Sequence, residues 1–272
     1  MSLQIKSKKL EALALSALLA VMAPLSAAVA QDADTKGFNV AAKADRSDRG
    51  FGDSKVQLEM ILRNASGKSA KRTLEITTLE LPDEKVGDKS LILFSSPGDI
   101  DGTALLSHAQ ILKPDNQWLF LPALKRTKRI SSKNKSGPFV GSEFAFEDIT
   151  GQELNKYEYT WLRAEKCGAF TCDVVERRPL YQSSGYTRQI GWIDQKHNQP
   201  RKLEYYDRRG ALLKTQSFEK YKLYKGKYWR PLLQKMVNHQ TGKSTELHFG
   251  PYQFGNGLRD RDFVKGALER LG

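Results

Sequence analysis

The chain has 272 residues and a formal net charge of +13 at pH 7, with 28% charged and 39% hydrophobic residues. Its length allows one large β domain or two small ones. The positive charge predicts attraction to anionic partners, such as lipid headgroups, lipopolysaccharide or an acidic protein face. The alternative, given equal weight, is a basic surface that is only solvated and binds no partner. No second long apolar run follows the N-terminal one, so we expect the mature protein to be soluble.

Residues 1–30 are predicted to be a cleaved secretory signal peptide. Three lysines precede an apolar run, Leu13–Met22, and Ala28-Val29-Ala30 supplies a cleavage motif. The run is shorter than the ~20 residues that a spanning helix needs, which favours cleavage over a membrane anchor. Cleavage removes three lysines and one glutamate and leaves a net charge of +11. We therefore expect the mature chain in a bacterial periplasm or secreted, where nucleic acid is not a partner.

The mature chain is expected to begin with a polar segment and a helix. Residues 31–53 are polar and rich in Gly and Asp, with a frayed start. Asp53 and Ser54 can cap a helix, and the apolar residues between Val56 and Ala65 form a stripe. This pattern predicts an amphipathic helix of about twelve residues. A strand over Val56–Met60 is the alternative.

From Ser69 onward the apolar period changes to two, which is typical of strands. Strands at regular spacing with turns between them indicate an antiparallel sheet. A short helix is expected at the end, over Asp262–Leu271. The predicted strands are Thr73–Leu81, Lys89–Ser96, Thr103–Leu112, Gln117–Pro122, Tyr157–Trp161, Thr171–Glu176, Arg188–Trp192, Leu203–Tyr206, Leu212–Phe218, Tyr228–Val237 and Ser244–Phe249.

An amphipathic sheet of this length has to bury its apolar face. With only one to three short helices, it must curl on itself or form two layers. A partly closed, strongly twisted sheet encloses a cavity, whereas a filled sandwich core does not. A one-residue error in register would reverse the face that lines the cavity. If the predicted register holds, the residues expected to line such a cavity are Leu74, Ile76, Leu91, Leu93, Trp118 and Phe120.

The most informative segment is Trp118–Thr150. An apolar strand runs into a basic cluster, then a Gly/Ser/Pro hinge, then an acidic and aromatic stretch from Ser142. We expect a flexible lid here, hinged at Gly137 and Gly141, with the aromatic side chains Phe139, Phe144 and Phe146. Headgroup or partner contact is expected at Arg126, Arg129 and Lys133. Ordinary loop packing and a solvated basic face are the alternatives.

The two cysteines, Cys167 and Cys172, flank a short Gly-containing connection between strand-like runs. An oxidising compartment favours a disulfide between them. Free thiols are the alternative, and a metal site is disfavoured because no further ligands flank the pair.

Patterns typical of catalysis are missing from the sequence. None of the four histidines lies in an HExxH motif, and there is no GxSxG motif. Thr241–Thr245 is similar to a phosphate-binding loop but lacks the first glycine. Glu143, Glu147 and Asp148 form a short acidic cluster of the kind that is usually solvated. We therefore expect no enzyme activity, no cofactor and no metal.

Three motifs carry a family resemblance: WLFLPALKRTKRISS, GPFVGSEFAFEDI and NGLRDRDFVKGALERL. They resemble the outer-membrane lipoprotein-sorting family of LolA-like periplasmic carriers, and more narrowly the branch linked with RND-type exporters. The resemblance implies a mainly β (α+β) fold: a single antiparallel, strongly curved, incomplete β-barrel with a few helices covering its open mouth. It covers nearly the whole mature chain, and so implies one domain over residues 31–272.

The resemblance also implies a task, which is to shield a lipid or the acyl chains of a lipoprotein from water on the way toward the outer membrane. Each buried methylene contributes ~0.8 kcal/mol, so a carrier must offer comparable apolar area and still release its load. A hopanoid-like or carotenoid-like cargo is an alternative. We expect a monomer that touches membrane surfaces transiently and that partners an RND-type exporter. The alternative function is a non-catalytic accessory subunit that docks on such a complex through its basic face.

Overall fold

The computed structural model describes residues 23–81, 86–111, 113–150 and 153–268, without the side chains of residues 23–30 and 132. Most of the predicted signal peptide therefore lies outside the described residues. Residues 23–30 form the first turns of helix α1 (Ala23–Asp48). Among the described helices, none is both long and apolar enough to cross a membrane.

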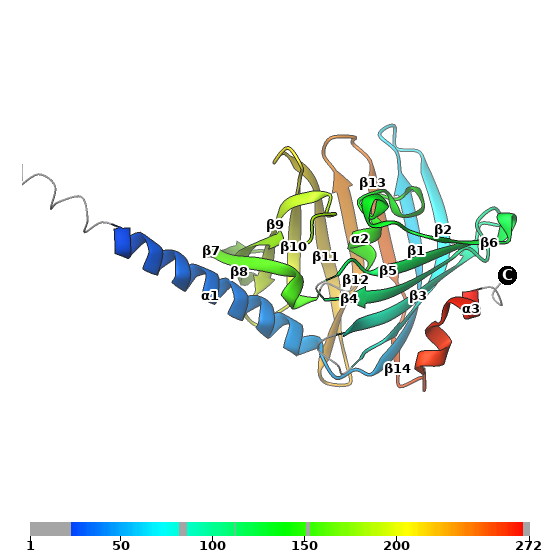
Figure 1. Cartoon of the computed structure of the whole chain (residues 1–272), viewed down its shortest axis with the longest axis horizontal. Helices are drawn as coiled ribbons and strands as arrows, with labels where there is room; N and C mark the ends of the chain where they lie inside the picture. The colour runs from blue at the N-terminus through cyan, green and yellow to red at the C-terminus, as the bar shows by residue number, and fades with distance from the viewer. Residues whose placement is uncertain (1–22, 82–85, 112, 151–152, 269–272) are drawn as a thin grey trace, which may run out of the picture.

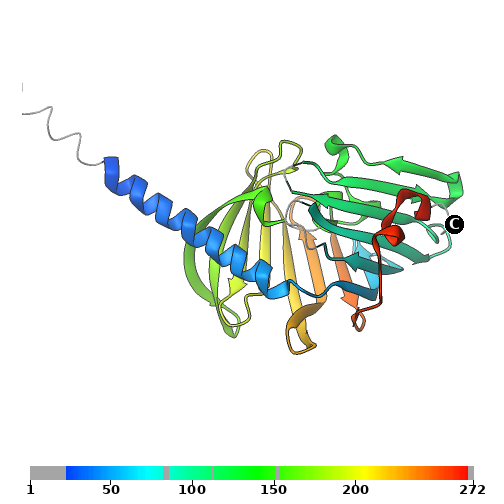
Figure 2. The same cartoon turned by 60° about the horizontal axis from the view of Figure 1, so that its bottom comes forward.

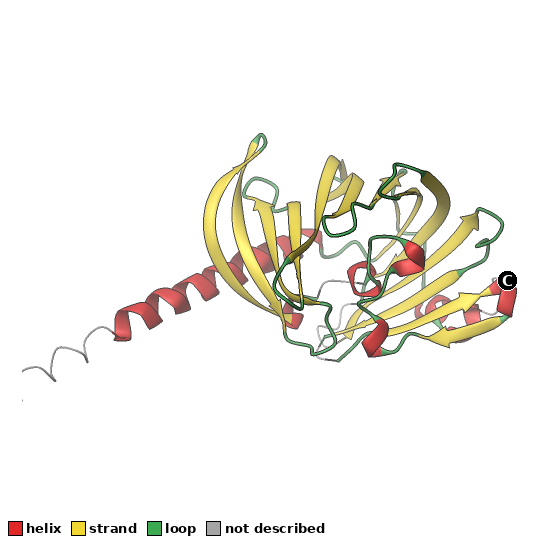
Figure 3. Ribbon diagram, turned by 90° about the horizontal axis from the view of Figure 1, so that it is seen from above, coloured by secondary structure: helices red, strands yellow, loops and turns green. Residues whose placement is uncertain are grey.

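The described strands form one sheet with the order β6-β5-β4-β3-β2-β1-β13-β12-β11-β10-β9-β8-β7, and β14 pairs with β1. Every pairing is antiparallel, and β6 and β7 end the sheet without meeting, so the prediction of a curved, incomplete antiparallel barrel is confirmed (Figures 1 and 3). The strands are β1 (Asp53–Arg63), β2 (Ser69–Leu79), β3 (Val86–Ser96), β4 (Ala104–Gln110), β5 (Asn116–Leu121), β6 (Arg126–Arg129), β7 (Tyr157–Cys167), β8 (Phe170–Pro179), β9 (Tyr186–Asp194), β10 (Pro200–Asp207), β11 (Leu212–Tyr224), β12 (Tyr228–Asn238), β13 (Ser244–Phe249) and β14 (Gln253–Phe254).

The N-terminal elements differ from the prediction. The polar segment, for which only a frayed start is expected, lies mostly in α1, and the segment expected to be a helix is β1. Val56, Leu58 and Met60 are buried while Gln57 is exposed, which is the two-residue alternation of a strand and agrees with the alternative reading. Pairing with β2 and β13 on both sides satisfies the backbone of β1 as a central strand.

Helix α1 lies across β7 (Figure 2). Its Gly37 allows this approach, because a Cβ there would stand 2.6 Å from the backbone nitrogen of Trp161. The ammonium of Lys36 lies 3.3 Å from the centre of the Trp161 ring. Thr160 donates a hydrogen bond of 2.6 Å to Asp34. These contacts, together with Val40 and Ala41, which pack against Tyr157 and Tyr159, hold the helix on the sheet.

After β6 the chain folds into the concave side of the sheet, where Figure 3 shows short helices surrounded by strands. We call residues 132–150 the plug. It contains α2 (Phe146–Ile149) and the 3-10 turns η2 (Ser132–Asn134) and η3 (Phe139–Gly141). Further single turns lie before and after it, η1 (Pro122–Leu124) and η4 (Leu154–Lys156).

The C-terminal segment covers part of the convex face. It consists of a 3-10 turn, η5 (Asp260–Phe263), and a short helix, α3 (Lys265–Leu268), so the predicted terminal helix is shorter and interrupted, and residues 269–271 lie outside the described part. Phe263 and Leu268 are 1% exposed and pack in a second apolar core against β4 and β5. His108 donates a 2.6 Å hydrogen bond to the Phe263 carbonyl, which fixes the segment.

Candidate ligand-binding cavity

A cavity of about 590 Å³ lies between the concave face of the sheet, the C-terminal half of α1 and the end of α2. Its wall is built by side chains that alternate toward this face from strands far apart in the sequence. The aliphatic part includes Val56, Ile76, Val175 and Leu203. The aromatic part includes Tyr159, Tyr205, Phe218, Tyr221, Phe249 and Tyr252.

Ion pairs of Arg49, the residue that follows α1, line one side of this cavity. Arg49 contacts Asp45 at 3.4 Å, Asp88 at 3.7 Å and Glu153 at 3.3 Å. Burial raises the pKa of Asp88 to about 6, although a hydrogen bond from the Leu81 amide and the charge of Arg49 act in the opposite direction. The end of α1 is thus held by charges that are only partly solvated.

The plug is fixed by a buried ion pair. Lys214 of β11 contacts Asp148 of α2 at 2.6 Å, and the two side chains are 4% and 3% exposed. Lys214 also donates to the Glu143 carbonyl at 2.9 Å, and Tyr186 donates to Asp148 at 2.9 Å. The neighbouring Glu147 accepts hydrogen bonds from the loop before β9, and burial raises its pKa. The plug is therefore held by buried polar contacts on both sides of α2.

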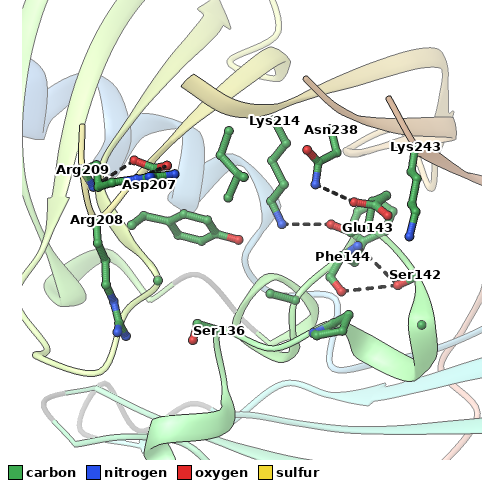
Figure 4. A pocket seen from close by; sticks show the side chains of 16 residues that line it. Ser136, Ser142, Glu143, Phe144, Asp207, Arg208, Arg209, Lys214, Asn238 and Lys243 are labelled. Atoms are coloured by element: carbon green, nitrogen blue, oxygen red, sulfur yellow. Dashed lines mark hydrogen bonds and ion pairs between the residues drawn. The ribbon is translucent and has the colours of Figure 1, made fainter. Parts of the chain in front are cut away.

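A second cavity, of about 630 Å³, lies on the other side of the plug and is more polar (Figure 4). Arg208, Arg209 and Lys243 reach it from the hairpins, and Asn238 donates to Glu143 at 2.7 Å. Lys214 lines this cavity while its partner Asp148 lines the first. The ion pair accordingly stands in the partition between the two cavities.

The six residues predicted to line one cavity lie on two faces. Ile76 lines the 590 Å³ cavity, and Leu74 lies in the main core next to it. The other four pack on the convex side with the C-terminal segment: Leu91, Leu93, Trp118 and Phe120. The register explains the division, because Ile76 pairs with Ile92, so the odd-numbered leucines of β3 point the other way. A single cavity cannot include all six.

The predicted lid aromatics are interior residues. Phe139, Phe144 and Phe146 are 0%, 2% and 9% exposed and belong to the main core. The ring of Phe139 lies 5.8 Å from that of Phe94 and 5.6 Å from that of Phe146. Whether the plug also acts as a lid stays a prediction.

The predicted basic contact residues are exposed. Arg126 and Arg129 lie on the edge strand β6, and Lys133 lies in η2. They line neither cavity. Lys135, from the same cluster, is instead 4% exposed and bonds to the Asp115 carbonyl.

Cys167 and Cys172 form the predicted disulfide at the tip of the β7–β8 hairpin, with their Cα atoms 5.9 Å apart. Within the described ranges, no group of three or more His, Cys, Asp or Glu side chains could hold a metal ion.

Sequence reasoning missed Arg177, which lines the 590 Å³ cavity from β8. The alternation gave the available signal, because Arg177 stands two residues after the buried Val175 and so shares its face. Sequence reasoning also missed the end of α1, which no apolar period marks.

Comparisons with known proteins agree on the fold. A family model described as an uncharacterized protein matches residues 87–270. A solved domain named for outer membrane lipoprotein sorting, from Vibrio parahaemolyticus, is 48% identical, with a TM-score of 0.85 over 87% of this chain and 100% of that one. A DUF1329 family protein from Desulfovibrio piger is 25% identical, with a TM-score of 0.82 over 87% and 99%. A LolA superfamily protein from Nitrosomonas europaea is 21% identical, with a TM-score of 0.68 over 84% and 97%. A comparison with curated proteins gives no match.

The open antiparallel half-barrel, with a helix across it and a cavity between them, places the protein in the class of LolA-like folds. The family match over most of the chain and the 48% identity to the Vibrio domain narrow this class. The chain belongs to the outer-membrane lipoprotein-sorting family.

Proposed function

We propose that this protein is a periplasmic carrier that holds one lipid molecule, or one acyl chain of a lipoprotein, in the 590 Å³ cavity and transfers it toward the outer membrane. The observation that carries the proposal is this cavity, which has an aliphatic and aromatic wall on the concave face. It falls in the range of ~300–1,000 Å³ that small-molecule sites occupy. The proposal includes no catalytic step.

The volume limits the cargo. If a methylene takes up about 30 Å³, the share of a water molecule in the liquid, the cavity holds roughly twenty methylenes. One long acyl chain fits, whereas the chains of a whole triacylated anchor would need the plug to move. Transfer of such a chain from water is favourable by ~0.8 kcal/mol per methylene. The cavity can therefore hold a lipid firmly enough to carry it through water.

The same proposal covers the compartment and partners. Residues 1–30 would direct the chain to the periplasm and be removed there. The exposed cations Arg126, Arg129 and Lys133 would touch anionic headgroups or a partner at loading or release, since a positive surface strengthens encounters with anionic membranes. An inner-membrane RND-type exporter is the proposed partner.

Native mass spectrometry of the mature protein from its own periplasm, followed by lipid extraction, tests the proposal. We expect a stoichiometric bound lipid or acylated peptide. Protein that is consistently empty, and that also takes up no fluorescent fatty acid, would overturn the proposal.

A matched pair of variants tests the location. Ile76→Trp extends a large side chain into the cavity, whereas Leu91→Trp makes a comparable change on the convex face of the next strand. We expect Ile76→Trp to reduce lipid occupancy at least about tenfold, because the indole takes up space that the cargo needs. Leu91→Trp should keep occupancy at the wild-type level. Equal loss in both variants would contradict the assignment of the cavity.

A further inference from the structure

One cation in the 590 Å³ cavity differs from the others. Among the described residues four basic side chains line it, and Arg49, Lys89 and Arg230 each form an ion pair with a carboxylate. Arg177 forms none with any carboxylate in the part of the chain that the structure describes. Carboxylates line the same cavity, but among the described residues none lies within ion-pair distance of the Arg177 guanidinium.

The surroundings of Arg177 hold the guanidinium in a fixed orientation. Its Nε donates a 2.7 Å hydrogen bond to Oε1 of Gln189, a side chain that is itself only 2% exposed. The guanidinium carbon lies 4.7 Å from the centre of the Tyr157 ring. Across the strand pair, Arg177 stands opposite Tyr159, which also lines the cavity. An amide oxygen and aromatic rings orient the group but do not neutralise it.

This arrangement favours an anionic ligand. A charge enclosed by protein without a counter-ion is costly, and the cost is recovered when an oxyanion binds. A guanidinium offers a planar fork of donors that matches the two oxygens of a carboxylate or phosphate. Nε is engaged by Gln189, and no hydrogen bond from the two terminal nitrogens is found within the described ranges, so these nitrogens can donate to such a ligand. The aromatic wall next to Arg177 would take the apolar part of the same molecule.

We propose that the natural cargo is a single-chain acidic amphiphile, whose carboxylate or phosphate group is bound by Arg177 and whose apolar chain lies along the wall of the cavity. This inference rests on the proposed carrier function and adds the chemistry of the cargo. It also agrees with the volume, which accommodates about one long chain. The headgroup thus enters the cavity together with the chain.

The test compares ligands of equal chain length and different heads on the delipidated full-length mature protein. Palmitic acid, hexadecanol and hexadecyl phosphate are titrated against a bound fluorescent fatty acid, and their displacement constants are measured. We expect both anions to bind the wild-type protein about ten- to hundred-fold more tightly than the alcohol, the range for a hydrogen bond to a charged group. Tighter binding of palmitic acid assigns a carboxylic acid as cargo, and tighter binding of the phosphate assigns a phosphate monoester.

Two variants locate the effect. Arg177→Gln removes the cavity charge, and Arg178→Gln makes the same change one residue along, on a side chain that is 65% exposed. We expect Arg177→Gln to bind acid and alcohol equally and Arg178→Gln to keep the preference. Equal binding of acid and alcohol by the wild-type protein would overturn this inference while leaving the carrier function standing. This comparison uses the wild-type protein alone, so it does not depend on whether a variant folds. Failure of all three ligands to bind would instead refute the carrier function.

Discussion

The buried ion pair between Asp148 and Lys214 should be the main fastening of the plug. The pair is almost completely enclosed, with its charged atoms 2.6 Å apart. Removing one partner leaves the other charge in the interior, which costs about 3–5 kcal/mol in comparable cases. We predict that both single variants, Lys214→Met and Asp148→Ala, lower the free energy of unfolding by amounts in this range.

The two variants should differ in a definite direction. In Lys214→Met, Asp148 keeps donors from the Tyr186 hydroxyl and from the Ala145 amide, at 2.9 and 2.6 Å, so the loss should be near 3 kcal/mol. In Asp148→Ala, the start of α2 also loses its acceptor, and Lys214 keeps only the Glu143 carbonyl and the faces of two tyrosine rings. That loss should be near 5 kcal/mol.

Urea unfolding, followed by intrinsic fluorescence, measures both values, and amide hydrogen exchange reports where the structure opens. The hydrogen bonds from Phe139 to Phe144 and from Phe146 to Gly137 lie within the plug, so their amides should lose protection first. As a control, Arg209→Met removes a cation that is 84% exposed and should change stability by less than about 0.5 kcal/mol. Losses below 1 kcal/mol in both buried variants would refute the reasoning.

Three further predictions concern α1, the cavity ion pairs and the convex core. Burial raises the pKa of Asp88 from 3.8 to about 6 in the folded protein, so the free energy of unfolding falls as pH rises from about 4 to 6. Asp88→Asn should remove this fall and raise the free energy of unfolding at pH 7 by about 2–3 kcal/mol. Parallel curves of urea stability against pH for the two proteins would contradict this. Gly37→Ala should lower the free energy of unfolding in urea by about 1–3 kcal/mol, because the added Cβ meets the backbone of β7. Gly98→Ala should cost clearly less, because the space at that position is open. Equal costs would argue against the close approach of α1. Phe263→Ala should lower the free energy of unfolding by about 3–5 kcal/mol, measured by thermal or urea unfolding. The neighbouring Val264 is 39% exposed, so Val264→Ala should cost about 0.5 kcal/mol or less. Similar small losses in both variants would show that the C-terminal segment adds little to the convex core.

The strands could be predicted from the sequence because their signals are local. Alternation within each run and the turn residues between runs are enough to locate a hairpin. The face that each strand turns inward is not local, since it depends on irregularities in the pairing. Register shifts lie between Thr73 and Leu74 and between Val86 and Lys89. This is why Ile76 was assigned to the cavity together with leucines of the opposite face.

The predictions for the two N-terminal elements were wrong for different reasons. In β1, Ile61 and Leu62 continue the apolar run beyond Met60, so both a helical stripe and an alternating strand fit the pattern. Helix α1 has little apolar periodicity, and its support comes from β7, more than one hundred residues later in the chain. Arg177 was missed for a related reason: a basic residue in a strand carries no sign of its partners until the strands are assembled.

An open barrel has two edges, and each edge is a template for the strand of another molecule. In this protein the two edge strands are protected in different ways. At one end of the sheet, α1 packs against the backbone of β7, where Gly37 leaves no room for a Cβ between the helix and the strand. At the other end, β6 is four residues long and displays the exposed cations Arg126, Lys128 and Arg129. A second copy would bring the same charges against them, so the basic strand hinders edge-to-edge growth into fibres while the barrel itself stays open.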